Sequence, residues 1–261
     1  EVLIPNPGYP GYVGPTILFG AKPVFYNLSK NFQLDLNEIK SKLSKKTAYI
    51  WVNFPSNPTG GVITINELED LVSFTKTNNL VIVYDNAYSE ITFDGYTAPS
   101  ILQIDGAKDI AVEIGSFSKM SSLAGYRVGW IAGNPQIIRA LAKVKSQLDS
   151  GLSLPLQNLA AYTLSNPDID WQKNMLSSYK NRRNVIATKL KVLGLTFSLP
   201  KGALYIWAKI PDTYKDSIEY SEEILRTKHV LFTPGSAFGS QGDRYIRVSI
   251  CINIDKIEEY L

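Results

Sequence analysis

Polar side chains that could carry chemistry follow three apolar, strand-like runs of this sequence, TAYIWVN, LVIVYD and AVEIGS. They are a lysine, a carboxylate, a phenol, an amide and two hydroxyls: Lys119, Asp85, Tyr88, Asn57, Ser116 and Ser118. Open α/β sheets bind ligands at the carboxyl ends of their parallel strands, so we expect these side chains to converge on one crevice. A lysine amine placed there can act as a nucleophile or as a proton carrier.

Each of these residues also has an ordinary structural interpretation when it is taken alone. Asp85 could cap a helix, Asn57 could form a turn before Pro58, and Lys119 could lie on the surface. Together with Arg127, eight residues after Lys119, they match the needs of an aldehyde coenzyme that carries a pyridine ring and a phosphate. The combination therefore favours a coenzyme site over a set of unrelated structural roles.

Different parts of such a coenzyme need different partners. Lys119 would form the Schiff base, and Asp85 would keep the pyridine nitrogen protonated so that the ring can accept electrons. Tyr88 and Asn57 would donate hydrogen bonds to the phenolic oxygen of the ring. The dianionic phosphate needs a guanidinium and hydroxyls, which the sequence offers in three residues: Arg127, Ser116 and Ser118.

The first half of the chain has the alternating pattern of a parallel sheet. The strand-like run TAYIWVN precedes a helix that opens at Thr64, with Glu67 as the second member of a capping box, and LVIVYD follows. The runs DIAVEIGS and YRVGWIAGN are almost entirely apolar, as expected of parallel strands covered on both faces. We therefore predict an α/β fold with a large, doubly wound, mostly parallel sheet.

The second half is first helical and then alternating. A long helical stretch begins near Ile169 and ends at Gly194, and a shorter helix spans Ser217 to Thr227 behind Asp216. Strands are expected near ALYIWAKI, HVLF and RYIRVSI. We predict a large coenzyme-binding domain over residues 1–170, and a linking helix with a smaller C-terminal α/β domain over residues 171–261.

Composition excludes several classes of partner. The net charge of +3 is spread over the chain, so neither nucleic acid nor an acidic membrane surface is expected as a partner. No apolar stretch approaches the ~20 residues that cross a bilayer. Cys251 is the single cysteine, and we expect it to be buried. A single cysteine cannot form an internal disulfide, which favours a cytoplasmic location. The single histidine, His229, has no ligand cluster around it, so no metal is expected.

Seven strings in order carry a resemblance to a known family: NPGYPGY, FPSNPTGG, YDNAYSEITFDGY, SFSKMSSLAGYRVGW, PKGALYIW, TPGSAFG and YIRVSI. The chain resembles the class I/II aminotransferases of fold type I, which depend on pyridoxal 5'-phosphate. The resemblance gives the residues above the same roles. It also implies that Tyr9 stacks on the coenzyme ring, that Arg247 grips the α-carboxylate of the substrate, and that Asn57 takes part in substrate binding.

The resemblance further implies a ping-pong transfer of an amino group between an L-amino acid and a 2-oxo acid, through a Lys119 internal aldimine, in a homodimer. Within the family, the chain is most similar to the branch of LL-diaminopimelate aminotransferase. It departs from that branch in lacking an aromatic residue soon after Lys119. The stretch SQLDSGLSLPLQN has no second arginine for an aspartate side chain. We also expect that the family's N-terminal segment is missing from this chain.

Three alternatives remain at this point. Another pyridoxal-phosphate reaction, carbon-sulfur lysis or decarboxylation, would use the same coenzyme residues. An aminotransferase-like regulatory domain would keep the fold without catalysis. An acylating serine enzyme would explain the S-x-x-K pattern of Ser116 and Lys119, but the K-T-G motif of that class is absent.

Overall fold

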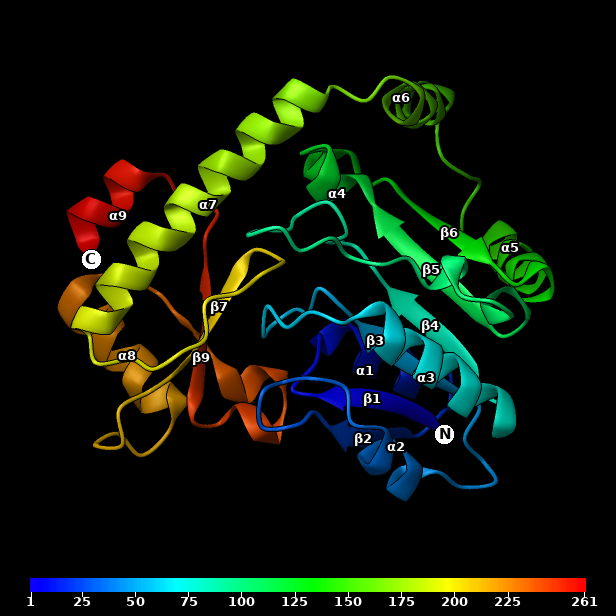
Figure 1. Ribbon diagram of the computed structural model, residues 1–261, viewed down its shortest axis with the longest axis horizontal. Coiled ribbons are helices and arrows are strands. Elements are labelled where there is room, and N and C mark those ends of the chain that lie inside the picture. The colour runs from blue at the N-terminus through cyan, green and yellow to red at the C-terminus, as the bar shows by residue number, and fades with distance from the viewer.

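A computed structural model describes residues 1–261 as two β-sheets flanked by helices (Figure 1). The larger sheet has the strand order β2-β1-β3-β4-β5-β6, with bounds Pro23–Asn27, Val2–Asn6, Tyr49–Asn53, Val81–Asp85, Ala111–Ser116 and Gly129–Gly133. Strands β1 to β5 run parallel to one another. The predicted α/β fold with a mostly parallel sheet is therefore confirmed.

Strand β6 is antiparallel to β5, so the expectation of a parallel strand at YRVGWIAGN is wrong. The connection from β5 contains only the four-residue helix α4 (Phe117–Met120), a single 3-10 turn (Ala124–Tyr126) and Arg127, whose backbone is left-handed at φ 54°. A parallel return needs a crossover that carries the chain back to the other end of the sheet. Here the chain stays at the same end and re-enters the sheet in the reverse direction.

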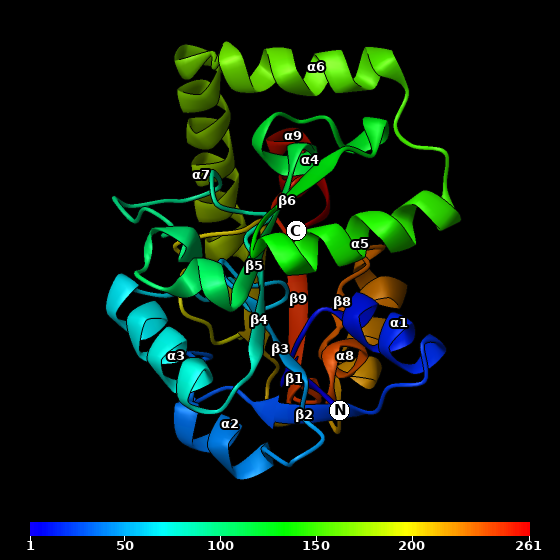
Figure 2. The same cartoon turned by 90° about the vertical axis from the view of Figure 1, so that its right-hand side faces the viewer.

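Helices cover both faces of the larger sheet (Figure 2). On one face lie α2 (Leu36–Lys42) and α3 (Ile65–Thr77), whose apolar side chains join those of the strands in one core cluster. On the other face lie α1 (Val13–Leu18) and α5 (Pro135–Leu148). The capping box predicted at the start of α3 is present, and it fixes where the helix after β3 begins.

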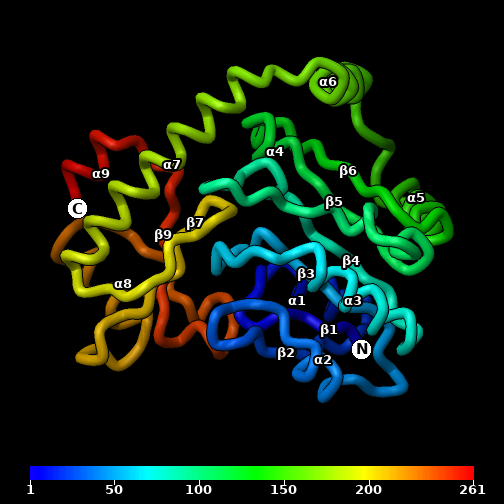
Figure 3. Tube along the Cα trace, in the orientation of Figure 1, coloured from blue at the N-terminus to red at the C-terminus, as the bar shows by residue number.

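Two further helices lead from the larger sheet to the smaller one (Figure 3). These are α6 (Leu154–Ser165) and the long α7 (Ile169–Val192), which matches the predicted helical stretch. Gly194, just past the end of α7, has the positive φ of 76° that favours glycine at a helix C-terminus. The helix therefore ends where the sequence predicts, and the chain turns into the second sheet.

The smaller sheet has the order β7-β9-β8 and is antiparallel throughout. Its strands are Tyr205–Lys209, Tyr245–Ser249 and Thr233–Pro234, and its helices are α8 (Ser217–Lys228) and α9 (Ile254–Tyr260). The strand expected at HVLF is wrong, because His229 closes α8 in a left-handed conformation and pairing begins only at Thr233. The division of the chain near residue 170 stays a prediction.

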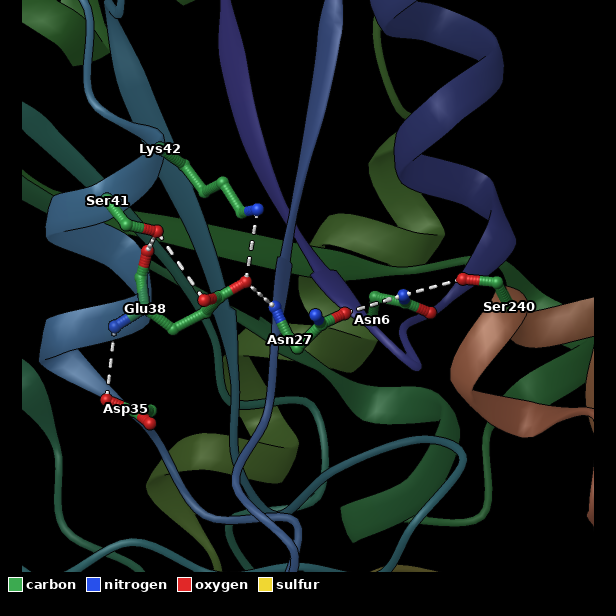
Figure 4. A network of polar contacts seen from close by, with 7 residues as sticks. All are labelled: Asn6, Asn27, Asp35, Glu38, Ser41, Lys42 and Ser240. Atoms are coloured by element: carbon green, nitrogen blue, oxygen red, sulfur yellow. Dashed lines mark hydrogen bonds and ion pairs between the residues drawn. The ribbon is translucent and has the colours of Figure 1, made fainter.

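Polar contacts join the segments around the smaller sheet to those around the larger sheet. At the end of β1, Asn6 Nδ2 donates to Asn27 Oδ1 on β2 at 2.9 Å and to Ser240 Oγ near β9 at 3.0 Å (Figure 4). On α7, the buried guanidinium of Arg183 pairs with Asp94 Oδ2 at 2.7 Å. These two links hold the smaller sheet against the loops that follow β1 and β4.

Cys251 is exposed, so the expectation that it is buried is wrong. It lies beyond Ser249, where β9 has ended, and the neighbouring Ile250 takes the buried position instead. Among the helices, none combines the length and the apolar character needed to span a bilayer.

Candidate active site

A cavity of about 320 Å³ opens where the strands β3, β4 and β5 end and the smaller sheet approaches them. Every site residue that the sequence singled out lines it. The lining consists of Tyr9, Asn53, Asn57, Asp85, Ala87, Tyr88, Ser116, Ser118, Lys119, Ala124, Arg127, Tyr205 and Arg247. The parallel sheet thus brings together side chains that are far apart in the sequence.

Asp85, the last residue of β4, is the only carboxylate in the lining. Its Oδ2 accepts a hydrogen bond of 2.5 Å from the Tyr12 hydroxyl, and its Oδ1 accepts one of 3.2 Å from the Ala87 amide. Burial raises the pKa of Asp85, and these two donors oppose that rise by stabilising the ionised form. Tyr12 is itself buried and stacks on Trp51 at 4.3 Å between ring centroids, so the donor is held in place.

Lys119 lies in α4, directly after β5. Ser116 begins this helix by accepting a hydrogen bond from the Ser118 amide at 3.2 Å. The short helix turns the lysine toward the cavity, where its Nζ lies 5.9 Å from the ring centroid of Tyr88. No carboxylate lies within ion-pair distance of the amine.

The cavity carries an excess of positive charge. Lys119, Arg127 and Arg247 face it without an ion-pair partner, against the single carboxylate of Asp85. The left-handed backbone of Arg127 folds its guanidinium back onto the Ala124 carbonyl at 3.0 Å. An excess of cations in a concave site favours anionic ligands such as phosphate and carboxylate groups.

Arg247 comes from β9 in the smaller sheet and reaches across to the larger one. Its Nη1 donates to Asn57 Oδ1 at 3.0 Å, and its guanidinium lies between the rings of Tyr205 and Phe238, at 4.4 and 4.7 Å. The buried Nε has no hydrogen-bond partner in the chain. A buried donor without a partner is costly.

The contact with Arg247 also fixes the orientation of the Asn57 amide. A guanidinium only donates, so the Asn57 oxygen must face Arg247 and the amide nitrogen must face the other way. The backbone of Asn57 is held by Asn53, whose Oδ1 accepts from the Asn57 amide at 2.8 Å and whose Nδ2 donates to the Asp85 carbonyl at 2.9 Å. Asn57 thus keeps a side-chain donor free for a ligand.

The whole chain, residues 1–261, matches the model of one protein family, aminotransferase class I and II. The chain belongs to this family. It is 36% identical over 261 residues to an LL-diaminopimelate aminotransferase of Halothermothrix orenii, with 99% of this chain and 67% of the relative covered. A second LL-diaminopimelate aminotransferase, from Trichormus variabilis, is 37% identical, with 98% of this chain and 66% of the relative covered.

Solved aminotransferase structures agree with the sequence comparison. An aromatic aminotransferase from Pyrococcus horikoshii superposes with a TM-score of 0.95 at 33% identity, covering 100% of this chain and 70% of that one. An aspartate aminotransferase from Thermotoga maritima gives 0.90 at 31% identity, covering 100% and 67%. The chain therefore has the fold type I architecture and spans about two-thirds of the length of its relatives.

Aminotransferases of this family depend on pyridoxal phosphate, and the lining of the cavity fits that coenzyme. It offers an unpaired amine at Lys119, a carboxylate fixed by Tyr12 at Asp85, and the cation of Arg127 beside two hydroxyls. The phenol of Tyr88 and the amide of Asn57 supply neutral donors. These are the groups that an aldehyde, a pyridine nitrogen, a phosphate and a ring oxygen require.

Two aromatic residues of this aminotransferase site were not predicted from the sequence. Tyr12 lies three residues after Tyr9, and its bond to Asp85 depends on the turn after β1. Tyr205 opens β7 in PKGALYIW, and its hydroxyl lies 3.0 Å from that of Tyr88. The strings that contain both residues carried the family resemblance, but nothing in their spacing indicates these contacts.

Proposed function

We propose that this chain forms the coenzyme site of an aminotransferase that moves an amino group between an L-amino acid and a 2-oxo acid by a ping-pong mechanism. The observation that carries the proposal is the charge pattern of the cavity. The cavity is lined by three cations without ion-pair partners and by one carboxylate that Tyr12 holds in place. A phenol and an amide that can donate hydrogen bonds line it as well. Each of these groups has a distinct task in amino transfer.

Pyridoxal phosphate, when bound, supplies an aldehyde that condenses with amines and a ring that accepts the electrons released at the substrate Cα. Lys119 holds the coenzyme between turnovers. With the coenzyme bound, the Lys119 amine would also serve as the base that takes the proton from the substrate Cα. The absence of a carboxylate partner leaves this amine free to move between the two tasks.

The remaining lining residues hold the coenzyme and tune it. Asp85 keeps a proton on the pyridine nitrogen, and Tyr88 and Asn57 donate to the ring oxygen. Tyr9, which is 45% exposed at the mouth of the cavity, stacks on the ring. The phosphate is held by Ser116, Ser118 and Arg127.

Arg247 binds the α-carboxylate of the substrate and so decides which way Cα points. Its planar guanidinium matches a carboxylate with two parallel hydrogen bonds, and the rings on either side keep it in one plane. Because Arg247 comes from β9 and Lys119 from α4, the substrate lies between the two sheets.

The names of the relatives suggest which donors to assay first. Two similar proteins are named LL-diaminopimelate aminotransferases, so LL-diaminopimelate is the first amino donor to test. Aromatic amino acids and aspartate come next, because similar solved structures carry those names. A screen of donors and acceptors with the full-length protein tests this part of the proposal.

We also propose that the full-length protein is a cytoplasmic homodimer. Large exposed apolar side chains lie on α6, among them Leu154, Tyr162 and Leu164. Such side chains are usually covered in the assembled protein. Sedimentation of the full-length protein tests the dimer, and a monomer at micromolar concentration would contradict it.

The direct test of the coenzyme site is spectroscopic. Pyridoxal phosphate added to the protein should produce the visible absorption band of a coenzyme joined to a lysine, and Lys119→Ala should abolish it. Lys143→Ala, on the exposed face of α5, is the matched control and should keep the band. A wild-type protein without the band would refute the proposed function.

A further inference from the structure

Tyr205 touches both halves of the proposed site. Its hydroxyl lies 3.0 Å from the hydroxyl of Tyr88, which follows β4. The Arg247 guanidinium packs over its ring, 4.4 Å from the ring centroid. Tyr205 stands on β7, so one side chain of the smaller sheet contacts a group assigned to the coenzyme and a group assigned to the substrate.

The bond between the two tyrosines has a direction that the site determines. Each phenol has one proton, and neither hydroxyl has another partner in the chain. Burial raises the pKa of Tyr88, so this phenol keeps its proton and can act as a donor. If Tyr88 donates to a ligand in the cavity, it must accept the proton of Tyr205, because its own proton is already in use.

The arrangement around the two rings shows which of them faces the coenzyme. Tyr88 lies beside Lys119, whose Nζ is 5.9 Å from its ring, and both follow strands of the larger sheet. Tyr205 lies on the Arg247 side of the cavity. The hydrogen bonds therefore run from Tyr205 to Tyr88 and from Tyr88 to the ligand.

We propose that Tyr205 is a positioning residue of the proposed aminotransferase, an inference that rests on the proposed function. Its hydroxyl directs the Tyr88 proton into the cavity and strengthens that donor, and its ring holds Arg247 in the plane in which it meets a carboxylate. The same side chain thereby aligns the coenzyme's ring oxygen and the substrate's carboxylate with each other.

The hydroxyl and the ring have effects that can be separated. Hydrogen bonds in a chain strengthen one another, so the loss of the Tyr205 donor weakens the bond that Tyr88 gives to the ring oxygen. The ring oxygen would then hold the neighbouring proton of the bound coenzyme more tightly. The pH midpoint of the change in the visible band would therefore rise. The ring contributes through its contact with the guanidinium, which tightens carboxylate binding.

The hydroxyl is tested with Tyr205→Phe in the pyridoxal-phosphate-loaded protein. The pH midpoint of the visible band should rise by roughly 0.1–0.7 units, from a cooperative gain of about 10–30% on a charge-assisted bond. The matched control is Tyr214→Phe, which removes a phenol bond of 2.9 Å to Glu223 in the same part of the fold but outside the cavity. The control should leave the midpoint at its wild-type value.

The ring is tested by comparing Tyr205→Phe with Tyr205→Leu. The phenylalanine keeps the face that carries Arg247, so the KM for the amino donor should change less than threefold. The leucine removes that face, and the KM should rise roughly threefold to thirtyfold. Equal KM values for the two variants would overturn the role of the ring.

A measurement without coenzyme checks the bond itself. Tyr88→Phe and Tyr205→Phe, singly and together, are unfolded in urea. Each substitution should lower the urea midpoint clearly less in the presence of the other than it does in the wild type, because the first substitution has already removed the shared bond. Additive effects would overturn the inference.

The outcomes also separate the inference from the function on which it rests. A wild-type protein without a visible band refutes the proposed function, and the inference falls with it. A band whose midpoint is the same in wild type and Tyr205→Phe refutes the inference alone. A raised midpoint in Tyr205→Phe with an unmoved Tyr214→Phe supports it.

Discussion

The bond between Tyr12 and Asp85 makes a quantitative prediction for Tyr12→Phe. The substitution keeps the ring that stacks on Trp51 and removes only the hydroxyl 2.5 Å from Asp85 Oδ2. A hydrogen bond to a charged acceptor contributes about 1.5–3 kcal/mol. Its loss should raise the pKa of Asp85 by about 1–2 units, beyond the rise that burial already causes.

The raised pKa should be visible in the pH dependence of turnover. In the proposed function Asp85 must be ionised to keep the coenzyme nitrogen protonated, so the acid limb of the rate profile should move up by about 1–2 pH units. The assay is the initial rate of amino transfer between pH 5 and 9, a range chosen to bracket the limb. Tyr26→Phe is the matched control, because the Tyr26 hydroxyl is buried and donates to the Trp51 carbonyl at 2.8 Å, away from the cavity.

Stability gives a second readout of the same substitution. A carboxyl group with a raised folded-state pKa stabilises the fold at low pH, and that contribution is lost as the pH rises through the folded-state value. Unfolding free energy should therefore fall more between acid and neutral pH in Tyr12→Phe than in the wild type. An acid limb that coincides with that of Tyr26→Phe would refute the reasoning about Asp85.

Three further substitutions test other parts of the site and fold. Asp85→Asn should still bind pyridoxal phosphate and show the visible band, but turnover should fall about 100-fold or more because the electron acceptor is weakened; unchanged turnover would disprove the role of Asp85. Arg247→Lys should raise the KM for the amino donor about tenfold, because an ammonium cannot form the paired contact, and steady-state kinetics measures this. Asp94→Asn should lower the unfolding free energy at neutral pH by about 1–2 kcal/mol, because the buried Arg183 loses a charged partner. The pKa of Asp94 is lowered to about 2, mainly by its bond to Arg183, so this difference should shrink as the pH falls from about 4 toward 2 in urea unfolding.

Much of the architecture was predictable because the sequence signals that determine it act locally. Apolar runs, the capping box at Thr64 and the glycine after α7 each act within a few residues. The strand near HVLF was misplaced because an apolar run alone does not reveal that His229 ends a helix in a left-handed conformation. The direction of β6 was missed because it depends on how tightly the chain turns at Arg127.

The convergence of the lining residues was predictable to the extent that it follows from strand order. Parallel strands end at one edge, which is why Asn57, Asp85 and Lys119 meet. The contacts of Tyr12 and Tyr205 could not be inferred in that way. They depend on side chains reaching across a turn or between two sheets, and such distances are set by tertiary packing.

The hydrogen bond between Arg247 and Asn57 spans the seam between the two sheets, and it has a consequence for how molecules are selected. How closely the two sheets approach sets the gap between the Arg247 guanidinium and the Lys119 amine. In the proposed function this gap must match the reach from a carboxylate to its adjacent carbon, so a compound with its amine one carbon farther away would present the wrong atom to the lysine. We therefore expect such compounds to be poor substrates whatever their side chains.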